Sequence, residues 1–501
     1  MLNIKHMRNN YNLVSRRSFV QNIFFTLGGL GICGFDNNLK THAKTNFTKQ
    51  KVIGYIKSHS SNEISSSALG VGFETLDRKM FDPSKCYESL NKLGVKWARC
   101  QTGWNRCETE KGQYDFKWLD EVVDNLIAVG IQPWFNVGYG NALYTPGAKN
   151  DSAVGWIPEN NEEAREGWKY FVNALAIHYK GRVAHYEIWN EPNVTPFWRP
   201  GKPTPEAYVA FIKRTATVLR TIIPDVVIIG GGFGGFPTDF LKECLKYGLA
   251  QYVNKISIHP YMLIPEKDYQ QQVMLWRELL SHQLPTPDLW QGECGCPSTD
   301  YSVGALSNFK WTESRQARWL LRRVINDLRM GLEMTSWYHT CDQKGYRLSD
   351  YPENKSGAYF GLLRMDDYTP KPSYFAYQTM CTLFDSQTHT SDSATIIFNA
   401  SEDTDTRVID KAVFSRHGYL IIAYWLSIDV HEDMEERAIS ITISVQQGLE
   451  ISKLVLIDPL NGEVLQLEGI QVKEQLHFSA LPLKDYPMLF ADIKAFEMTS
   501  T

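Results

Sequence analysis

The sequence predicts a (β/α)8 TIM barrel followed by a C-terminal all-β sandwich module. Two observations lead to this prediction. From residue 69 onward, apolar runs alternate eight times with amphipathic stretches of helical period, which is typical of a closed barrel of parallel strands. After about residue 384 the helical stretches stop, and short apolar runs separated by turn residues follow. With 501 residues, the chain is long enough for a large barrel and an accessory module.

Eight apolar runs have the length and composition of buried barrel strands. They lie at Leu69–Phe73, Val95–Cys100, Ile131–Val137, Ala184–Trp189, Val226–Gly230, Lys255–His259, Asp288–Gly292 and Met334–His339. Helical periodicity is clearest at Phe116–Val129, Glu162–Tyr179 and Pro205–Ile223. Gly94 and Gly130 each follow a helical stretch and precede a strand, as glycines that end helices do.

The same alternation is compatible with an open doubly wound sheet. Such a sheet would carry a Gly-rich phosphate loop after its first strand, leading into a helix. The segment Leu69–Glu74 has only two of these glycines and no helix directly behind it, and the glycines of 231–235 follow the fifth strand. We therefore predict the closed barrel.

The C-terminal module is predicted from eight short alternating runs. They are Ala394–Phe398, Lys411–Phe414, Tyr419–Trp425, Ala438–Val445, Lys453–Ile457, Glu463–Leu467, Gln475–Phe478 and Met488–Ile493. Lys51–Ser58 has the same character, and we expect it to pair into this module. The predicted organisation is a signal peptide at 1–35, a leader with its strand at 36–66, the barrel at 67–384 and the β-sandwich at 385–501.

The N-terminal segment has the features of an export signal. Basic residues precede Phe19–Ile32, an apolar stretch of 14 residues that is too short to span a bilayer comfortably. Ser15–Val20 resembles a twin-arginine motif, with an ordinary secretory signal as the alternative. Cys33 leaves a lipid anchor open. We expect an exported protein, periplasmic or at the cell surface, without a membrane span.

Composition excludes some partners and leaves others open. The net charge of −4 gives no basic surface for nucleic acid or anionic lipid. Aromatic residues are 13% of the chain, which suits either a large core or flat rings that stack on sugars. The eight cysteines beyond Cys33 lack zinc-type spacing, so we expect mostly buried thiols, with one disulfide near the site as the alternative. We expect no metal or organic cofactor.

Two carboxylates stand where predicted strands end. Glu191 follows the fourth run and Glu293 follows the seventh. In a barrel, catalytic residues lie at the C-terminal ends of the strands, and the fourth and seventh ends face each other across the mouth. A carboxyl pair about 5–5.5 Å apart is what a retaining glycosidase uses to cleave a glycosidic bond. Alone, either carboxylate would more readily be a helix cap or a salt-bridge partner.

The segment Trp189–Pro192 resembles the acid/base motif of clan A glycoside hydrolases, and the resemblance covers residues 69–384. It implies that Glu191 is the acid/base, that Asn190 binds the sugar 2-hydroxyl, and that Glu293 is the nucleophile. A barrel followed by a β-module is most similar to family 39, which contains xylosidases and iduronidases. The context Gly292–Cys294 departs from the usual nucleophile motif of that family, so the sugar stays open.

Other strand ends supply the remaining site predictions. The resemblance implies that Arg99 keeps the nucleophile ionised by lowering its pKa, and that His259 and Tyr261 line the site, with the tyrosine hydroxyl bonded to Glu293. Asn136, Tyr139 and Trp337 are candidates for the sugar subsite. The alternatives are a structural ion pair for Arg99, a core histidine for His259 and a barrel plug for Trp337. Glu187, inside the fourth strand, is expected to pair with Arg99 or another base.

These residues predict a retaining β-glycosidase that hydrolyses plant or host glycan oligosaccharides. The long segments 141–156 and 342–356 would wall the pocket and favour exo action. Two alternatives remain: a non-catalytic glycan-binding protein on a decayed barrel, and a transglycosylase with the same catalytic residues. The oligomeric state is left open.

Overall fold

The computed structural model describes residues 50–145, 147–148, 153–346, 357–400, 408–430, 437–445, 451–472 and 475–500. The predicted signal peptide, its twin-arginine segment and Cys33 lie outside these residues, as do parts of the two long segments expected to wall the pocket. Among the residues described, no helix combines the length and apolar character needed to cross a bilayer.

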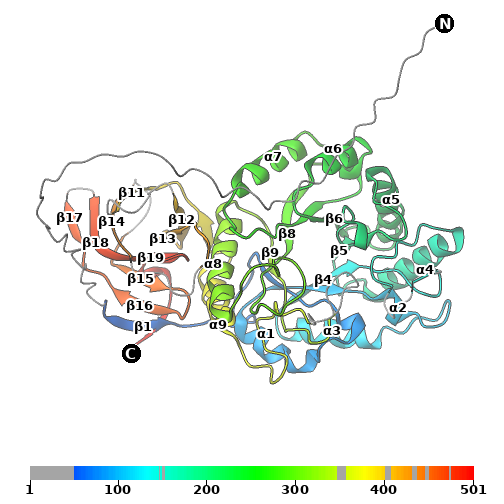
Figure 1. The fold of residues 1–501 in the computed structure, drawn as a ribbon, viewed down its shortest axis with the longest axis horizontal. Helices are drawn as coiled ribbons and strands as arrows, with labels where there is room; N and C mark the ends of the chain where they lie inside the picture. Colours follow the sequence, from blue (N-terminus) through cyan, green and yellow to red (C-terminus); the bar gives the residue numbers. More distant parts are fainter. Residues whose placement is uncertain are drawn as a thin grey trace, which may run out of the picture. The chain divides into compact units, whose positions relative to one another are not determined.

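Eight parallel strands close into a barrel (Figure 1). They are β2 (Leu69–Gly72), β3 (Trp97–Gln101), β4 (Gln132–Val137), β5 (His185–Ile188), β6 (Val227–Gly234), β7 (Lys255–His259), β8 (Asp288–Cys294) and β9 (Thr335–Trp337). Closure is direct, because Leu69 of the first strand pairs with Thr335 of the last. The predicted barrel is confirmed, and the open doubly wound sheet is wrong.

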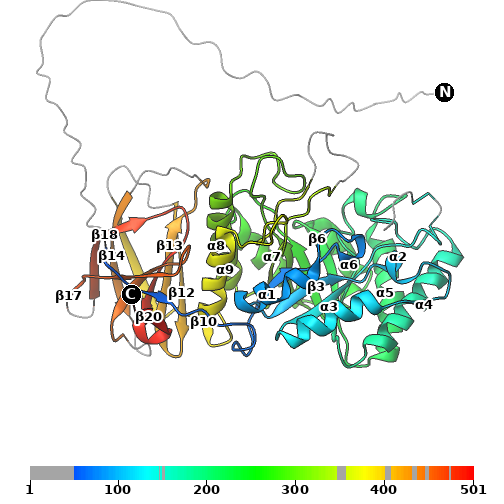
Figure 2. The same ribbon diagram turned by 90° about the horizontal axis from the view of Figure 1, so that it is seen from below.

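Helices surround these strands on the outside (Figure 2). They are α1 (Tyr87–Leu93), α2 (Trp104–Cys107), α3 (Lys117–Ala128), α4 (Glu162–Tyr179), α5 (Pro205–Ile222), α6 (Thr238–Lys246), α7 (Tyr269–Ser281), α8 (Glu313–Arg329) and α9 (Pro372–Leu383). The long helices begin at polar caps: the side chains of Asn161, Thr204 and Thr312 each accept from a backbone N–H three residues on. These caps fix where each helix leaves the barrel mouth.

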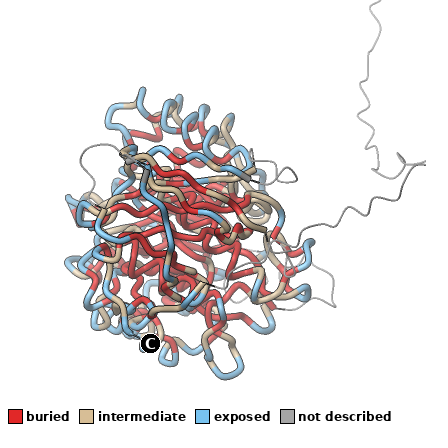
Figure 3. Tube along the Cα trace, turned by 90° about the vertical axis from the view of Figure 1, so that its left-hand side faces the viewer, coloured by how far each residue is buried: buried red, intermediate tan, exposed pale blue. Residues whose placement is uncertain are grey.

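The barrel interior is filled by aromatic side chains at one end. Trp134, Trp290 and Met334 are buried together with Ile229, and Trp97 packs against them. This layer fills the barrel near the beginnings of the strands, and the polar side chains that follow the strands lie at the opposite end. Buried residues run through the interior of the chain, and exposed residues gather on its outer turns (Figure 3).

Strand β6 continues beyond its predicted end at Gly230 as far as Gly234. Its pairing with β7 shifts between Gly230 and Phe233, which marks a bulge. Gly231 and Gly232 have φ values of 91° and 55°, and a Cβ on Gly231 would lie 2.6 Å from the carbonyl oxygen of Ser257. Glycine is therefore required for the strand to pass this close to β7 on its way to the mouth.

Two antiparallel sheets form the C-terminal module, as predicted. The larger has the order β10-β12-β13-β19-β15-β16-β1-β20 and the smaller β11-β14-β18-β17. Their strands are β1 (Val52–Ile56), β10 (Thr388–Thr390), β11 (Ala394–Ala400), β12 (Ile409–Arg416), β13 (Tyr419–Leu426), β14 (Arg437–Val445), β15 (Leu454–Asp458), β16 (Glu463–Gln466), β17 (Ile470–Val472), β18 (Gln475–Leu483), β19 (Met488–Asp492) and β20 (Met498–Ser500). The N-terminal strand β1 pairs with β16 and β20.

Candidate active site

Glu191 is held at the barrel mouth by a sharp turn after β5. Trp189 and Glu191 both adopt left-handed backbone conformations, with φ of 70° and 44°. Such conformations are strained for these residues and persist only where the surroundings fix them. The N–H of Glu191 donates to the carbonyl of Gly232 at 2.8 Å, and the Trp189 indole donates to the carbonyl of Phe197 at 2.7 Å. These bonds turn the carboxylate toward the barrel axis.

Glu293 reaches the mouth through a register shift in β8. The pairing of β8 with β9 is irregular between Gln291 and Cys294, so the strand side chains do not alternate regularly there. A Cβ on Gly292 would lie 2.1 Å from the Ser257 hydroxyl oxygen. A side chain in place of Gly292 would therefore force the Ser257 hydroxyl to move.

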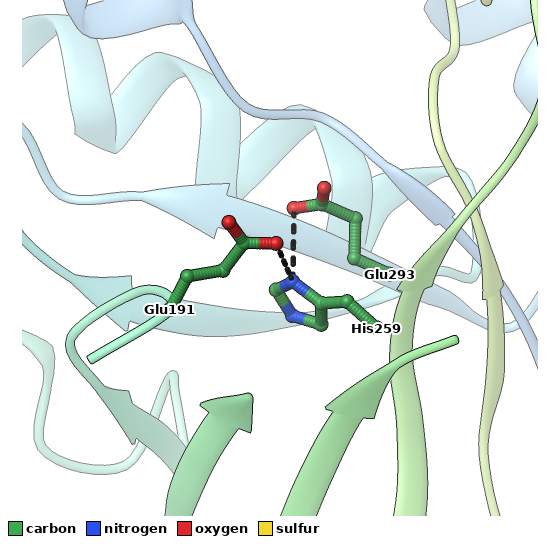
Figure 4. Close-up of side chains that lie close together, drawn as sticks. All are labelled: Glu191, His259 and Glu293. Carbon is green, nitrogen blue, oxygen red and sulfur yellow. Dashed lines mark hydrogen bonds and ion pairs between the residues drawn. The ribbon is translucent and has the colours of Figure 1, made fainter. Parts of the chain in front are cut away.

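The two carboxylates meet at His259, the last residue of β7 (Figure 4). One carboxylate oxygen from each of Glu191 and Glu293 and one imidazole nitrogen all lie within 4.8 Å of one another. Inverting glycosidases hold their carboxyls about 6.5–9.5 Å apart, so this close pair fits double displacement. The side chains of Glu191 and Glu293 are only 16% and 14% exposed.

His259 touches both carboxylates. Its Nδ1 lies 3.1 Å from Oε1 of Glu191 and 3.9 Å from Oε2 of Glu293. Burial disfavours the charged imidazole, but the carboxylates of Glu293 and Glu191 together raise the pKa of His259 above its usual value. The two carboxylates thus favour the protonated form of His259, whereas the sequence indicated only that it lies in the site.

Arg99 organises the base of the site with all of its donors buried. Nε donates to Oε2 of Glu187 at 2.6 Å, and Nη2 donates to Oδ1 of Asn190 at 2.9 Å. Nη1 is shared between Oε2 of Glu293 at 2.6 Å and Oε1 of Glu74 at 3.1 Å. The structural pairing with Glu187 and the contact with Glu293 therefore occur together, where the sequence left them as alternatives.

Burial and the neighbouring charges together set the pKa of Glu293. Burial raises the pKa of Glu293, His259 and Arg99 lower it, and the nearby negative charges of Glu74 and Glu191 raise it again. The net direction is upward. Arg99 therefore lowers the pKa of Glu293 as predicted, but burial, together with the charges of Glu74 and Glu191, outweighs it, so the expected net lowering is wrong.

The same three groups are the only ones among the described residues whose ligand atoms converge as a metal site would require. Arg99 already donates to Glu293 at 2.6 Å, and its fixed positive charge opposes a cation at that carboxylate. The arrangement therefore favours acid–base and nucleophilic chemistry over metal binding.

Tyr261 holds the other oxygen of Glu293. Its hydroxyl donates to Oε1 of Glu293 at 2.7 Å, the contact that the resemblance implied. Burial and the Glu293 carboxylate raise the pKa of Tyr261 well above its usual value, so the phenol stays a donor. Glu293 thus has one oxygen on Arg99 and one on Tyr261, which fixes the plane of the carboxylate.

The remaining predicted residues lie nearby but differ in what they contact. The buried Asn136 donates to Glu187 at 3.3 Å and to the carbonyl of Trp189 at 2.7 Å, so its amide holds the turn before Glu191 rather than facing a sugar. Trp337 is 2% exposed and donates to the carbonyl of Phe360 at 3.1 Å. It is placed at the end of β9 as predicted, with its ring buried.

Two buried groups of the site, Glu74 and His339, were missed in the sequence. Glu74 follows β2, and its carboxylate lies 3.2 Å from Nε2 of His339, which follows β9. The signal was the one used for Glu191, a carboxylate directly after a barrel strand. Tyr139, in contrast, was among the predicted subsite residues: it is buried, and its ring packs edge-on against Trp189 in the turn that precedes Glu191.

The chain is similar to known glycoside hydrolases in part of its sequence and in its fold. The family model "Glycosyl hydrolases family 39" matches residues 85–283. A β-xylosidase from Geobacillus stearothermophilus is 26% identical over 162 residues, which are 30% of this chain and only 31% of that protein. The chain therefore spans less than a third of that curated relative in the match.

Solved structures show the same fold over most of the chain. A family 39 glycoside hydrolase from the gut symbiont Bacteroides cellulosilyticus WH2 matches with a TM-score of 0.62 and 22% identity, covering 87% of this chain and 83% of that one. A family 39 β-xylosidase from Caulobacter crescentus gives 0.55 and 16%, covering 88% and 97%. A family 30 subfamily 8 xylanase from Clostridium acetobutylicum gives 0.55 and 15%, with the same coverage.

Proposed function

We propose that this chain, whose barrel is that of a clan A glycoside hydrolase most similar to family 39, is a retaining β-glycosidase. The observation that carries the proposal is the pair Glu191 and Glu293, set at the ends of the fourth and seventh barrel strands with oxygens within 4.8 Å of each other. A water molecule does not fit between the pair and a sugar at this separation, so direct attack by one carboxylate is favoured.

In the first step Glu191 donates its proton to the glycosidic oxygen while an oxygen of Glu293 attacks the anomeric carbon. The bond to the leaving group breaks, and a covalent glycosyl ester forms on Glu293. Arg99 and Tyr261 hold the two oxygens of the nucleophile in a fixed plane, so little reorientation is needed. The aglycone departs as a neutral alcohol.

In the second step Glu191, now a carboxylate, takes a proton from water as the water oxygen attacks the anomeric carbon. Glu293 leaves, and the two inversions return the original configuration. His259 lies 3.1 Å from Glu191, and in its protonated form it stabilises the carboxylate that appears when Glu191 gives up its proton. Glu191 thus serves as acid and then as base.

Activity requires Glu293 to be ionised when the substrate arrives. Because burial raises the pKa of Glu293, the acidic limb of kcat/KM should lie higher than for an exposed carboxyl. Activity is present above that pKa and is lost as the pH falls through it. This limb is a direct readout of the nucleophile.

We propose exo action on short oligosaccharides, with β-xylosides as the first substrates to test. Support for exo action comes from the low exposure of the two carboxylates, which indicates an enclosed pocket rather than an open cleft. Support for xylose comes from the relatives named as β-xylosidases. Plant or host glycan oligosaccharides are the natural source of such ends.

The test is a panel of aryl β-glycosides of xylose, glucose, galactose and glucuronic acid, together with α-L-arabinofuranosides. We expect turnover of at least one glycoside by the wild type, and release of single sugars from the corresponding oligosaccharide. Glu191→Gln and Glu293→Gln should abolish it. Turnover of none of these, or full activity of both variants, would overturn the proposal. An added alcohol acceptor distinguishes transfer from hydrolysis by the products formed.

We also propose that the chain is exported, on the strength of its basic N-terminal segment and the apolar stretch Phe19–Ile32. Fractionation of cells that produce the full chain tests this. A shortened chain outside the cytoplasm is expected, and replacing Arg16 and Arg17 by lysine should block export if the twin-arginine route is used. Full-length protein confined to the cytoplasm would contradict export.

A further inference from the structure

The loop after β7 places Tyr261 against the nucleophile, and side chains of α8 hold this loop by hydrogen bonds. Residues 260–268 follow His259 and lead into α7. The indole of Trp319 in α8 donates to the carbonyls of Met262 and Leu263, at 3.2 and 3.0 Å. The loop backbone just after Tyr261 is therefore tied to a buried helix, at two successive carbonyls.

Glu266 is the strongest anchor of this loop. Arg322 of α8 donates to both of its oxygens in a bidentate pair, and Asn326 of the same helix donates to Oε1 at 3.1 Å. Burial raises the pKa of Glu266, but the opposing effect of Arg322 and the other donors is larger and lowers this pKa overall, so the carboxylate is ionised. A buried carboxylate that accepts several hydrogen bonds from one helix fixes the loop in one position.

The fourth donor to Glu266 comes from the C-terminal module. Trp425 belongs to β13, is fully buried, and its indole Nε1 donates to Oε1 of Glu266 at 2.8 Å. Arg322 also donates to the carbonyl of Ile428, just after the same strand. Helix α8 lies between the module and the barrel strands in both views (Figures 1 and 2). The module thus contacts the loop that presents Tyr261.

A second buried ion pair joins α8 of the barrel to the C-terminal module. Arg318 of α8 donates to both oxygens of Asp485 in the module, at 3.1 and 2.9 Å, and both side chains are buried. Buried polar contacts specify one relative position, since a shifted arrangement would leave charges without partners. The contact of Trp425 with Glu266 is therefore part of a specific polar interface between the module and the barrel.

We propose that Trp425 is a positioning residue for catalysis. It holds Glu266, and through the loop it holds the Tyr261 hydroxyl against Glu293, which makes the C-terminal module part of the catalytic unit. The inference rests on the proposed glycosidase function. It differs from a purely structural role, in which Trp425 would affect folding stability alone.

The test is a double-mutant cycle in the full chain. Trp425→Phe keeps a large ring but removes the indole donor, and Tyr261→Phe removes the hydroxyl at the other end of the relay. We expect Trp425→Phe to lower kcat/KM on an aryl glycoside roughly 3- to 10-fold, since the loop loses one hydrogen bond to a charged group. In the Tyr261→Phe background it should have no further effect.

A pH profile separates positioning from stability. A hydrogen bond donated to a carboxylate favours its charged form, so a loosened Tyr261 should raise the pKa of Glu293. The acidic limb of kcat/KM in Trp425→Phe should therefore move to higher pH. The matched control is Tyr424→Phe, the adjacent residue of β13, whose hydroxyl donates to the carbonyl of Pro482 at 2.9 Å within the module. Its acidic limb should match the wild type.

Loss of activity that is additive with Tyr261→Phe, or an unmoved acidic limb in Trp425→Phe, overturns the inference while the proposed function stands. A wild-type chain that cleaves no glycoside overturns both. If Trp425→Phe does not fold, Glu266→Gln takes its place in the cycle, because the neutral amide weakens the pair with Arg322 and releases the same loop. Its effect should be non-additive with Tyr261→Phe as well.

Discussion

Glu74 shares Arg99 with Glu293, and its charge should therefore influence the pKa of the nucleophile. Glu74 and Glu293 both accept from the same Nη1, at 3.1 and 2.6 Å, so their bonded oxygens lie within about 6 Å of each other. Burial raises the pKa of Glu74, but the opposing effect of His339 and Arg99 is larger and lowers this pKa overall, so Glu74 carries a negative charge. That charge raises the pKa of Glu293. Replacing Glu74 by glutamine removes the charge and keeps a carbonyl oxygen for Arg99.

The magnitude follows from the distance. Two unit charges about 6 Å apart repel by about 3 kcal/mol at an effective dielectric of about 20, which corresponds to about 2 pH units. Arg99 and His339 lie against Glu74 and compensate part of its charge. We therefore expect Glu74→Gln to lower the pKa of Glu293 by about 1 unit. Because activity is lost as the pH falls through this pKa, the acidic limb should move to lower pH.

The assay is the pH dependence of kcat/KM on an aryl glycoside with a good leaving group, which reports ionisations of the free enzyme. Glu88→Gln is the control, since Glu88 is an exposed acid whose removal changes net charge equally. An acidic limb that stays in place, or moves to higher pH, would refute the reasoning that Glu74 and Glu293 compete for Arg99.

Further predictions concern the other groups of the site. His259→Gln removes a positive charge from beside the carboxylates, so the acidic limb should move to higher pH, opposite in sign to Glu74→Gln; a shift to lower pH would contradict the charge of His259. Glu191→Ala should lower kcat roughly 100- to 10,000-fold for poor leaving groups, with azide restoring turnover as a glycosyl azide; activity independent of the leaving group would contradict its acid role. Asn136→Ala should cost about 1–3 kcal/mol of unfolding free energy, measured by denaturant titration, because the buried carbonyl of Trp189 loses its Asn136 donor, whereas KM should hardly change; a large rise in KM alone would return Asn136 to the sugar subsite.

The fold was largely predictable because its elements are coded locally. Each barrel strand is an apolar run of the right length, and each module strand is a short alternating run, so both were found from period and turn residues. The extension of β6 through Gly231 and Gly232 was not. Glycines that allow a bulge look the same in sequence as glycines in a loop, and only the proximity of Ser257 distinguishes them.

The site was predictable to the level of strand ends and not beyond. Counting strands placed Glu191 and Glu293 together, but the direction of Asn136 depends on the pleat at the end of β4, which no pattern in the run specifies. The pKa of Glu293 depends on its burial and on how many carboxylates share Arg99. That number is set by three different strands, and a sequence does not show which of their side chains converge.

The most direct test of the account is the identity of the residue that carries the sugar. The enzyme would be incubated with a 2-deoxy-2-fluoro glycoside of the sugar it cleaves best, bearing a dinitrophenolate leaving group, and the digested protein mapped by mass spectrometry. The account predicts one sugar per chain, attached to the peptide that contains Glu293. A label on another residue, or no label together with an inverted product, would contradict it.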